Sequence, residues 1–455
     1  MRVQASIASV AYLCALAGQG ANAAITLDLT SESSIKSAAK TIAADLMSYY
    51  TGNRPGDVPG NLPDPYYWWE CGAMFGTMIN YWHYTGDTTY NDITQQALLH
   101  QAGDDGDFMP MNQSKTLGND DQGFWGLAAM TAAETNFQNP PDDQKQWLAL
   151  AQGVFNTQVV RWDTATCGGG FRWQIFTFNS GYNYKNSISN GCFFNLAARL
   201  AVYTGNATYA EWAEKTWDWM NAIGLMVEGE SVFDGTQNID NCTSKDHNQW
   251  SYNAGIYLHG SAAMYNFTNG SAVWQGRLQS MLNVSDTFFT DGIMYEACEA
   301  SGKCNVDQRS FKAYLARWMA ATTKWASWTS DHIMPLLTTS ATAAVKTCTG
   351  GTTGTQCGLV WGSGVNDGSM GVGESMAALE IVQSHLVANS ATFASQVQGT
   401  GNSTGDVNAG GSATSNTADE LTSTPVTTAD RAGAGILTAI VLCGVIGGSA
   451  MMVLP

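Results

Sequence analysis

Apolar residues recur every three or four positions between about residues 35 and 390, and almost no stretch alternates apolar with polar residues. The first spacing places apolar side chains on one face of a helix, whereas strict alternation marks a half-buried strand. The pattern therefore predicts an all-α chain. We expect twelve helices, near residues 35–50, 68–85, 89–102, 120–136, 142–160, 186–204, 207–224, 249–267, 271–288, 308–324, 330–345 and 372–388.

A short turn motif recurs between the predicted helices, as YTGD at 84–87, YTGN at 203–206 and FTNG at 267–270. The last two copies lie about 64 residues apart and the first two about twice 60 apart, so a further hairpin near Asn136 would fill the gap. A regular period of this length is typical of repeated helix pairs. Six pairs predict an (α/α)6 barrel, a toroid of six helical hairpins. An open solenoid is the structural alternative.

Polar segments rich in glycine and aromatic residues separate the hairpins. In a closed toroid these segments would gather at one rim, around a cleft lined by Trp, Tyr, Asn and Asp. Flat apolar rings beside polar groups suit a sugar, although many of the Trp residues could equally fill the core. The segments are 104–121, 164–190, 229–250 and 290–308.

The first residues have the pattern of a secretory signal peptide. Arg2 supplies the positive charge, residues 5–17 are apolar, and residues 21–23 (Ala-Asn-Ala) give a small-x-small cleavage pattern. We therefore expect residues 1–23 to be removed, and a toroid domain to occupy residues 24–390.

The last residues have the pattern of a glycosylphosphatidylinositol (GPI) attachment signal. Small residues and a Ser/Thr/Asn/Gly-rich spacer precede an apolar tail at 432–455. The alternative is a membrane-spanning tail anchor, which the absence of a positive cluster after the tail disfavours. We expect a linker at 391–416, attachment at Asn416 with Gly411 and Ser412 as rivals, and removal of 417–455.

Removal of both ends would leave eight of the ten cysteines, an even number in an oxidising compartment. The close pairs Cys298/Cys304 and Cys348/Cys357 are expected to form loop disulfides. The remaining cysteines, Cys71, Cys167, Cys192 and Cys242, could pair in three ways. Seven sequons agree with secretion and predict glycosylation at Asn112, Asn206, Asn241, Asn266, Asn269, Asn283 and Asn402.

The chain carries 38 acidic and 20 basic residues, a formal net charge of −18. A polyanion binds a phosphate backbone poorly, so no nucleic-acid partner is expected. The six histidines form no H-E-x-x-H motif, the cysteines form no C-x-x-C, and no glycine run leads into Lys-Ser/Thr. We therefore expect neither a metal nor a cofactor.

The candidate chemistry lies in the segment G-N-D-D-Q-G-F-W at 118–125. Asn119 could cap the following helix, with Gln122 closing a capping box. Asp120 and Asp121 in a first turn could simply stabilise the helix dipole, by about 0.3–1 kcal/mol each. Their place in a rim segment favours catalysis. Consecutive helical residues point about 100° apart, so the two carboxyl groups could approach the separation of about 5–5.5 Å found in retaining glycosidases.

With these aspartates the sequence resembles glycoside hydrolase family 76, more narrowly its fungal GPI-anchored mannan endo-1,6-α-mannosidases. The resemblance covers almost the whole mature chain in order. It implies an (α/α)6 barrel and retaining cleavage of α-1,6-mannosidic linkages, with Asp120 as nucleophile and Asp121 as acid/base. It also implies sugar-binding roles for Trp173, Lys185, Asn186, Asp234, Trp250 and Tyr252. The matching segments are 107–112, 118–122, 167–174, 184–191, 232–235, 250–253, 291–296 and 311–318.

The expected protein is thus an enzyme held at the outer membrane leaflet by a lipid anchor, at the fungal cell surface or in the wall. Its substrate would be mannan or a mannose-containing GPI glycan. A covalent intermediate can pass to water or to a sugar hydroxyl, and the resemblance makes cell-wall glucan a candidate acceptor. The rival hypothesis is a non-catalytic scaffold that binds cell-wall carbohydrate.

Overall fold

The computed structural model describes residues 25–113, 115–399 and 438. The predicted signal peptide at 1–23, the sequon at Asn402, the attachment site Asn416 and, apart from residue 438, the tail at 417–455 lie outside the described residues. None of the helices within the described part is long and apolar enough to cross a membrane.

The described residues form twelve α-helices, as the sequence predicts. The observed bounds differ from the predicted ones by a few residues at the helix ends. The helices are α1 (Glu32–Met47), α2 (Trp68–Thr85), α3 (Asn91–Gln101), α4 (Asn119–Glu134), α5 (Trp147–Val159), α6 (Ser187–Thr204), α7 (Ala207–Ala222), α8 (Ser251–Phe267), α9 (Ala272–Asp286), α10 (Phe311–Trp325), α11 (Ser330–Lys346) and α12 (Val372–Gln383).

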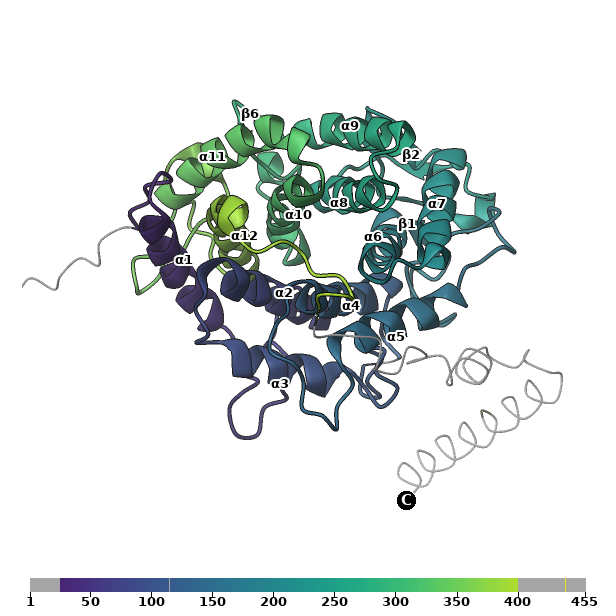
Figure 1. Cartoon of the computed structure of the whole chain (residues 1–455), viewed down its shortest axis with the longest axis horizontal. Coiled ribbons are helices and arrows are strands. Elements are labelled where there is room, and N and C mark those ends of the chain that lie inside the picture. The colour runs from purple at the N-terminus through teal and green to yellow at the C-terminus, as the bar shows by residue number, and fades with distance from the viewer. Residues whose placement is uncertain (1–24, 114, 400–437, 439–455) are drawn as a thin grey trace, which may run out of the picture.

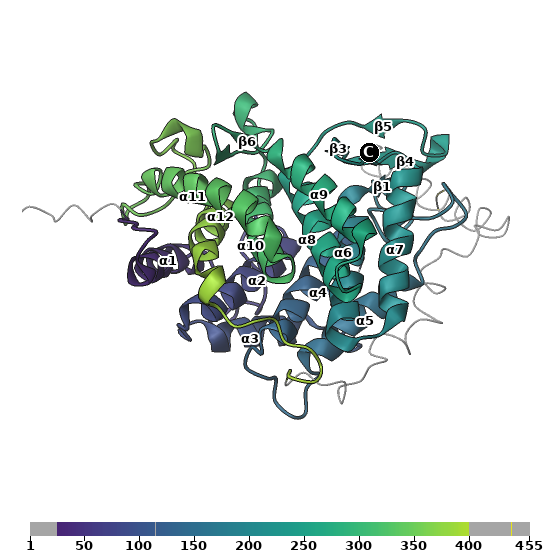
Figure 2. The same ribbon diagram turned by 45° about the horizontal axis from the view of Figure 1, so that its top comes forward.

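The even-numbered helices form an inner ring, in which each helix packs against the next and α12 packs against α2. The odd-numbered helices surround this ring (Figures 1 and 2). Closure of α12 onto α2 gives the predicted (α/α)6 toroid rather than an open solenoid.

Close approach between the inner helices depends on glycine. A Cβ atom on Gly72 of α2 would lie 2.6 Å from the ring of Trp125 in α4. A Cβ on Gly191 of α6 would lie 2.6 Å from Ile256 in α8. Any larger residue at either position would force neighbouring helices apart, because protein cores are close-packed. The inner helices are accordingly buried almost all round, which is expected of helices at the centre of a large domain.

The predicted turn motif joins inner to outer helices at one pole of the toroid. Gly86 after α2 and Gly205 after α6 adopt left-handed conformations, with φ of 76° and 70°. Asn136 after α4 and Asn269 after α8 do the same, each with φ of 53°. Glycine and asparagine tolerate this conformation at helix C-termini. The inner helices therefore end together at this pole, which we call the far pole.

The described connections at the opposite rim contain seven short strands, whereas the sequence predicts almost none. Each strand has only two or three residues, too few to produce a visible alternation of apolar and polar positions. Three of them form an antiparallel sheet in the order β1-β4-β5, which joins two of the predicted rim segments. The strands are β1 (Tyr184–Asn186), β2 (Met226–Val227), β3 (Ser231–Val232), β4 (Gly235–Gln237), β5 (Lys245–Asp246), β6 (Phe289–Thr290) and β7 (Ile293–Met294).

Residues 391–399 fall in the predicted linker but pack across the far pole (Figure 1). The Ala394 N–H donates to the Glu134 carbonyl at the end of α4 (2.7 Å). The Phe393 ring packs edge-on against Trp325 at the end of α10, with centroids 5.1 Å apart. The folded domain therefore extends past residue 390, and residues 391–399 lie at the pole opposite the rim.

The predicted loop disulfides Cys298–Cys304 and Cys348–Cys357 are confirmed. Of the other four cysteines, Cys167 pairs with Cys242, whereas Cys71 and Cys192 remain buried thiols on inner helices. The six sequon asparagines within the described residues are all exposed.

Candidate active site

A cleft opens at the rim, where the inner helices begin. It encloses about 610 Å³ including its open mouth. The first residues of α2, α4, α6, α8 and α10 contribute to its walls, and rim segments complete it. The lining residues are Trp69, Asp120, Asp121, Phe124, Trp173, Tyr184, Asn186, Ile188, Asp234, Tyr252, Asp307 and Phe311.

Asp121 holds the start of α4. Its Oδ2 accepts the Gly118 N–H (2.7 Å), so Gly118 is the N-cap and Asp121 supplies the half of a capping box that a glycine N-cap allows. The predicted pair of Asn119 and Gln122 is wrong by one position. These two side chains instead donate to carbonyl oxygens of neighbouring segments, Asn119 to Arg172 (2.8 Å) and Gln122 to Asp107 (2.7 Å).

Asp120 faces the cleft beside Asp121. Its Oδ2 accepts from Asn186 Nδ2 (3.2 Å) and its Oδ1 accepts from the Asp121 N–H (3.1 Å). A Cβ on Gly118 would lie 2.3 Å from Asp120 Oδ1 and 3.3 Å from Asp121 Oδ2. Both carboxyl groups therefore turn toward the same side of Gly118.

The surroundings of the two aspartates affect their pKa values differently. Burial raises the pKa of both carboxyl groups. The hydrogen bonds from Asn186 and the Asp121 N–H oppose this rise at Asp120, whereas the charge of Asp120 raises the pKa of Asp121 further. Asp121 is therefore the member that keeps a proton when Asp120 is ionised, which suits an acid beside an anionic nucleophile.

Two further carboxylates line the cleft. The Tyr184 hydroxyl donates to Asp234 (2.6 Å), and the Trp69 indole N–H donates to Asp307 (3.0 Å). Burial raises the pKa of both carboxyl groups. Among the described lining residues there is no Lys or Arg. Backbone N–H groups at the start of α4, where the helix dipole is positive, bond only to Asp120 and Asp121 of the four carboxyl groups.

Aromatic rings form much of the wall. Tyr252 at the start of α8 stacks on Phe311 at the start of α10, with centroids 3.8 Å apart and planes within 8°. Trp173 lines the cleft from the rim segment. Trp250 is not among the lining residues: it packs edge-on against Phe311, and its indole N–H bonds to Asp234.

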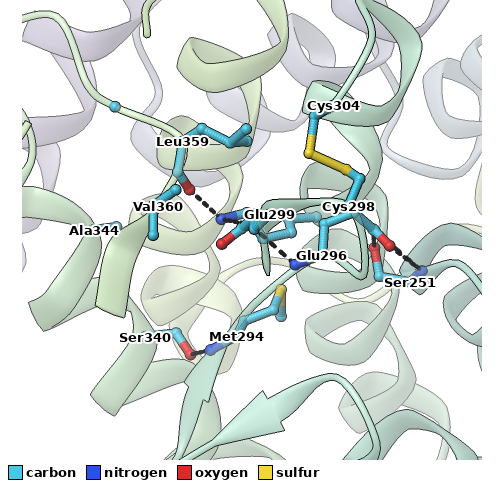
Figure 3. A network of polar contacts seen from close by, with 12 residues as sticks. Ser251, Met294, Glu296, Cys298, Glu299, Cys304, Ser340, Ala344, Leu359 and Val360 are labelled. Atoms are coloured by element: carbon cyan, nitrogen blue, oxygen red, sulfur yellow. Dashed lines mark hydrogen bonds and ion pairs between the residues drawn. A yellow bond between two sulfur atoms is a disulfide. The ribbon is translucent and has the colours of Figure 1, made fainter. Parts of the chain in front are cut away.

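A buried polar network behind this wall fixes the start of α8 (Figure 3). Glu296 accepts from the Ser251 backbone N–H (3.3 Å) and from the Ser251 hydroxyl. Its own N–H donates to Glu299 (3.0 Å), which pairs with Lys312 Nζ (2.7 Å). Ser251 precedes Tyr252 and Lys312 follows Phe311, so residues 296–299 hold both stacked rings. Burial raises the pKa of Glu296 to about 7.

Lys185 does not reach the cleft, which corrects its assignment as a sugar-binding residue. Successive side chains of a strand point to opposite faces, so Lys185 points away when its neighbour Asn186 faces the cleft. The Lys185 ammonium pairs with Asp163 (3.2 Å) and donates to the carbonyls of Thr166 (2.8 Å) and Gly169 (2.5 Å). Lys185 therefore links β1 to residues 163–169 of the same rim connection.

Of the other predicted sugar-binding residues, Trp173, Asn186, Asp234 and Tyr252 all line the cleft. Asp307, Trp69 and Phe311 also line it but were missed. The signal for them was present in the sequence, because Asp307 lies in a predicted rim segment and the two aromatic residues lie in or beside predicted helix starts. Within the described part of the chain, no cluster of three or more His, Cys, Asp or Glu residues is arranged to hold a metal ion.

A closed (α/α)6 toroid with paired carboxyl groups and aromatic walls in a rim cleft defines a carbohydrate-active enzyme. The family model of glycosyl hydrolase family 76 matches residues 34–397. The chain belongs to this family and is a glycoside hydrolase.

Two yeast relatives match over nearly their full length. Mannan endo-1,6-alpha-mannosidase DCW1 of Saccharomyces cerevisiae is 50% identical over 422 residues, which cover 92% of this chain and 93% of the relative. Mannan endo-1,6-alpha-mannosidase DFG5 of the same yeast is 46% identical over 434 residues, covering 94% of each chain.

Solved structures show the same fold. Dfg5 from Chaetomium thermophilum, crystallised with glucosamine, is 48% identical, with a TM-score of 0.81, and the match covers 84% of this chain and 97% of that one. An α-1,6-mannanase from a Salegentibacter species, in an inactive variant with two consecutive aspartates replaced by alanine, is bound to α-1,6-mannotetrose. It is 17% identical with a TM-score of 0.62, covering 77% of this chain and 98% of that one.

Glu70, in the first turn of α2 beside Trp69, gives the site a pH-dependent contribution to stability. One carboxylate oxygen accepts the Tyr67 N–H (3.1 Å), and the other is buried with no hydrogen-bond partner among the described residues. Burial raises the pKa of Glu70 to about 8. The protonated form therefore favours the folded state, and this contribution declines as pH rises from about 4.5 toward 8.

Replacement Glu70→Gln should remove this decline, because the amide cannot ionise. We expect the difference in unfolding free energy, variant minus wild type, to rise between pH 6 and pH 8 by about 1.4 kcal/mol per pH unit at most. Urea unfolding at both pH values measures it. The exposed Glu211→Gln is the control and should run parallel to wild type. A Glu70→Gln curve that also runs parallel would refute the role of Glu70.

Proposed function

We propose that this chain is a retaining, endo-acting enzyme that cleaves α-1,6-mannosidic linkages in fungal mannan or in a GPI glycan. The observation that carries the proposal is the buried pair at the start of α4, in which Asn186 and the Asp121 N–H bond to Asp120 while Asp121 accepts the Gly118 N–H. Burial raises the pKa of both carboxyl groups, and the charge of Asp120 raises the pKa of Asp121 further. The names of the yeast relatives and the mannotetrose bound to the bacterial family member support the substrate class.

The reaction follows from the proton arrangement of the pair. Asp120 attacks the anomeric carbon while the bond to the leaving oxygen breaks, and Asp121 gives its proton to that oxygen. A covalent mannosyl-Asp120 ester results. Asp121, now a carboxylate, takes a proton from an incoming hydroxyl as its oxygen attacks the same carbon, which releases Asp120. Asn186 steadies the charge on Asp120 before the attack.

The incoming hydroxyl can belong to water or to a second sugar. Water gives hydrolysis, whereas a hydroxyl of cell-wall glucan gives transglycosylation in wall assembly. Both outcomes use the same intermediate, so Asp120 and Asp121 serve either reaction.

The excess acidity of the cleft favours a mannose-containing GPI glycan as a substrate alongside mannan. A neutral polymer needs only two carboxyl groups, yet Asp234 and Asp307 also line the cleft and are bonded there to neutral donors. A protonated amino sugar would pair with either one. The similar Dfg5 structure was crystallised with glucosamine, which supports such a group in the substrate.

Replacement of either aspartate tests the catalytic assignment against the rival scaffold that only binds carbohydrate. Asp120→Asn and Asp121→Asn should each lower kcat on a linear α-1,6-mannooligosaccharide by at least about a hundredfold, since each loses one half of the pair. Product analysis by NMR should show first-formed α-anomers from wild type. Chromatography with an added glucan oligomer should resolve hydrolysis from transfer.

Two results would contradict this assignment. Unchanged product formation in both variants would place the chemistry elsewhere, and first-formed β-anomers would exclude a retaining mechanism. Glu211→Gln, an exposed position on the outer helix α7 and outside the cleft lining, serves as a general mutagenesis control.

We also propose that the chain is secreted and held at the cell surface or in the wall by a GPI anchor. Residues 391–399, the last described residues of the domain, lie at the far pole, where Ala394 and Phe393 pack. An anchor attached beyond this point would leave the cleft facing away from the membrane, toward the polymer.

The anchor proposal predicts one outcome for the full chain and another for a truncated chain, both expressed in a fungal host. A phosphatidylinositol-specific phospholipase should release the surface protein, and deletion of residues 432–455 should send it to the medium. Immunoblots of medium, membrane and glucanase-released wall fractions distinguish these fates and detect covalent transfer to the wall. Surface retention of the truncated chain in membranes would refute the anchor.

A further inference from the structure

Exposed aromatic rings gather around the cleft. Within the described residues four aromatic side chains are exposed, namely Tyr67 (56%), Trp173 (38%), Phe178 (63%) and Trp328 (37%). Trp328 lies after α10, at the far pole. The other three lie at the rim, and Phe178 belongs neither to the cleft lining nor to any of the predicted sugar-binding positions.

The three rim aromatics lie on both sides of the catalytic pair. Helix α4, which carries Asp120 and Asp121, lies between α2 and α6 in the inner ring. Tyr67 is the N-cap of α2, whereas Trp173 and Phe178 belong to the segment that leads into β1 and α6. A linear polymer that crosses the pair would therefore meet aromatic surface on each side.

The segment that carries Phe178 begins and ends at the cleft. Gln174 forms a bridge with Gly118, directly before the catalytic residues. The Trp173 N–H donates to the Tyr184 carbonyl (2.7 Å), which closes the loop. A Cβ on Gly181 would lie 2.4 Å from the Trp173 ring, so the loop folds back against that ring. Phe178 is thus carried by a loop whose two ends lie at the cleft, outside the cleft lining itself.

Phe178 is ordered without being buried. Its ring stacks on Phe176, with centroids 5.5 Å apart and planes within 4°. Phe176 itself is only 3% exposed. Asn179 fixes the backbone by donating to the Lys115 carbonyl and to Gln174 Oε1, each at 3.1 Å. A ring already held in place loses little conformational entropy when a ligand covers its open face.

We propose that Phe178, supported by Phe176, is an outer subsite that stacks against a sugar unit of the chain beyond Trp173. The occupant is a neutral linear saccharide continuous with the one in the cleft, since the open ring offers an apolar face and no charge. This inference rests on the proposed function and extends it: Phe178 gives the enzyme its preference for long chains over short ones.

The test compares chain lengths. For wild type and Phe178→Ala, kcat/KM is measured on an α-1,6-linked mannotriose and on a mannohexaose or longer chain. We expect the ratio of long to short kcat/KM to fall about five- to tenfold in Phe178→Ala, through a higher KM for the long chain. Phe178→Trp should retain the ratio. Trp328→Ala, which removes an exposed ring at the far pole, is the matched control.

An unchanged ratio in Phe178→Ala, or an equal loss on both substrates, would overturn the proposal. Calorimetry on the double variant Asp120→Asn/Asp121→Asn separates this failure from failure of the proposed function. If wild type cleaves no α-1,6-mannoside, the proposed function fails. Length-dependent binding that Phe178→Ala removes would still support the subsite, and binding that is independent of length would refute it.

Discussion

The site depends on one constraint: the six inner helices run in the same direction around a closed ring. Their N-termini must therefore meet at one rim, and their C-termini at the far pole, where left-handed Gly or Asn residues follow α2, α4, α6 and α8. The unpaired N–H groups of helix starts carry partial positive charge. Asp120 and Asp121 accept such N–H groups at the start of α4, whereas Asp234 and Asp307 accept from the side chains of Tyr184 and Trp69.

The groups that surround each carboxyl group of the cleft give it a different role. Asn186 stabilises the charge on Asp120, whereas Asp121 closes the cap of its own helix and feels the charge of Asp120. The aromatic wall is set from behind by Glu296 and Glu299, which hold the residues adjoining Tyr252 and Phe311. The same burial that makes the cleft suitable for a sugar also raises the pKa of its four carboxyl groups.

The sequence was sufficient for the ring and for the place of the cleft. Helical periodicity and the repeated turn motif predicted the twelve helices, and the glycine- and aromatic-rich segments predicted the rim. Local contacts across the rim could not be read from it. Asn119 was placed as the N-cap because asparagine is a common capping residue and Gln122 follows three residues later. The observed pair, Gly118 and Asp121, has the same spacing, but a glycine carries no side chain that marks it as the cap. Lys185 was placed in the cleft because it lies in a segment that matches the family, and a strand of three residues gives no alternation to show that its side chain points away. Phe178 had no motif to mark it.

The central claim is that Asp120, rather than Asp121, forms the bond to the sugar. The most direct measurement is to trap the intermediate with a 2-deoxy-2-fluoro-α-mannosyl donor that carries a good leaving group, and to locate the label by peptide mass spectrometry. The account predicts one fluoromannosyl group on Asp120, absent from Asp120→Asn protein. A label on Asp121, or turnover of the donor to β-anomeric product with no labelled peptide, would contradict it.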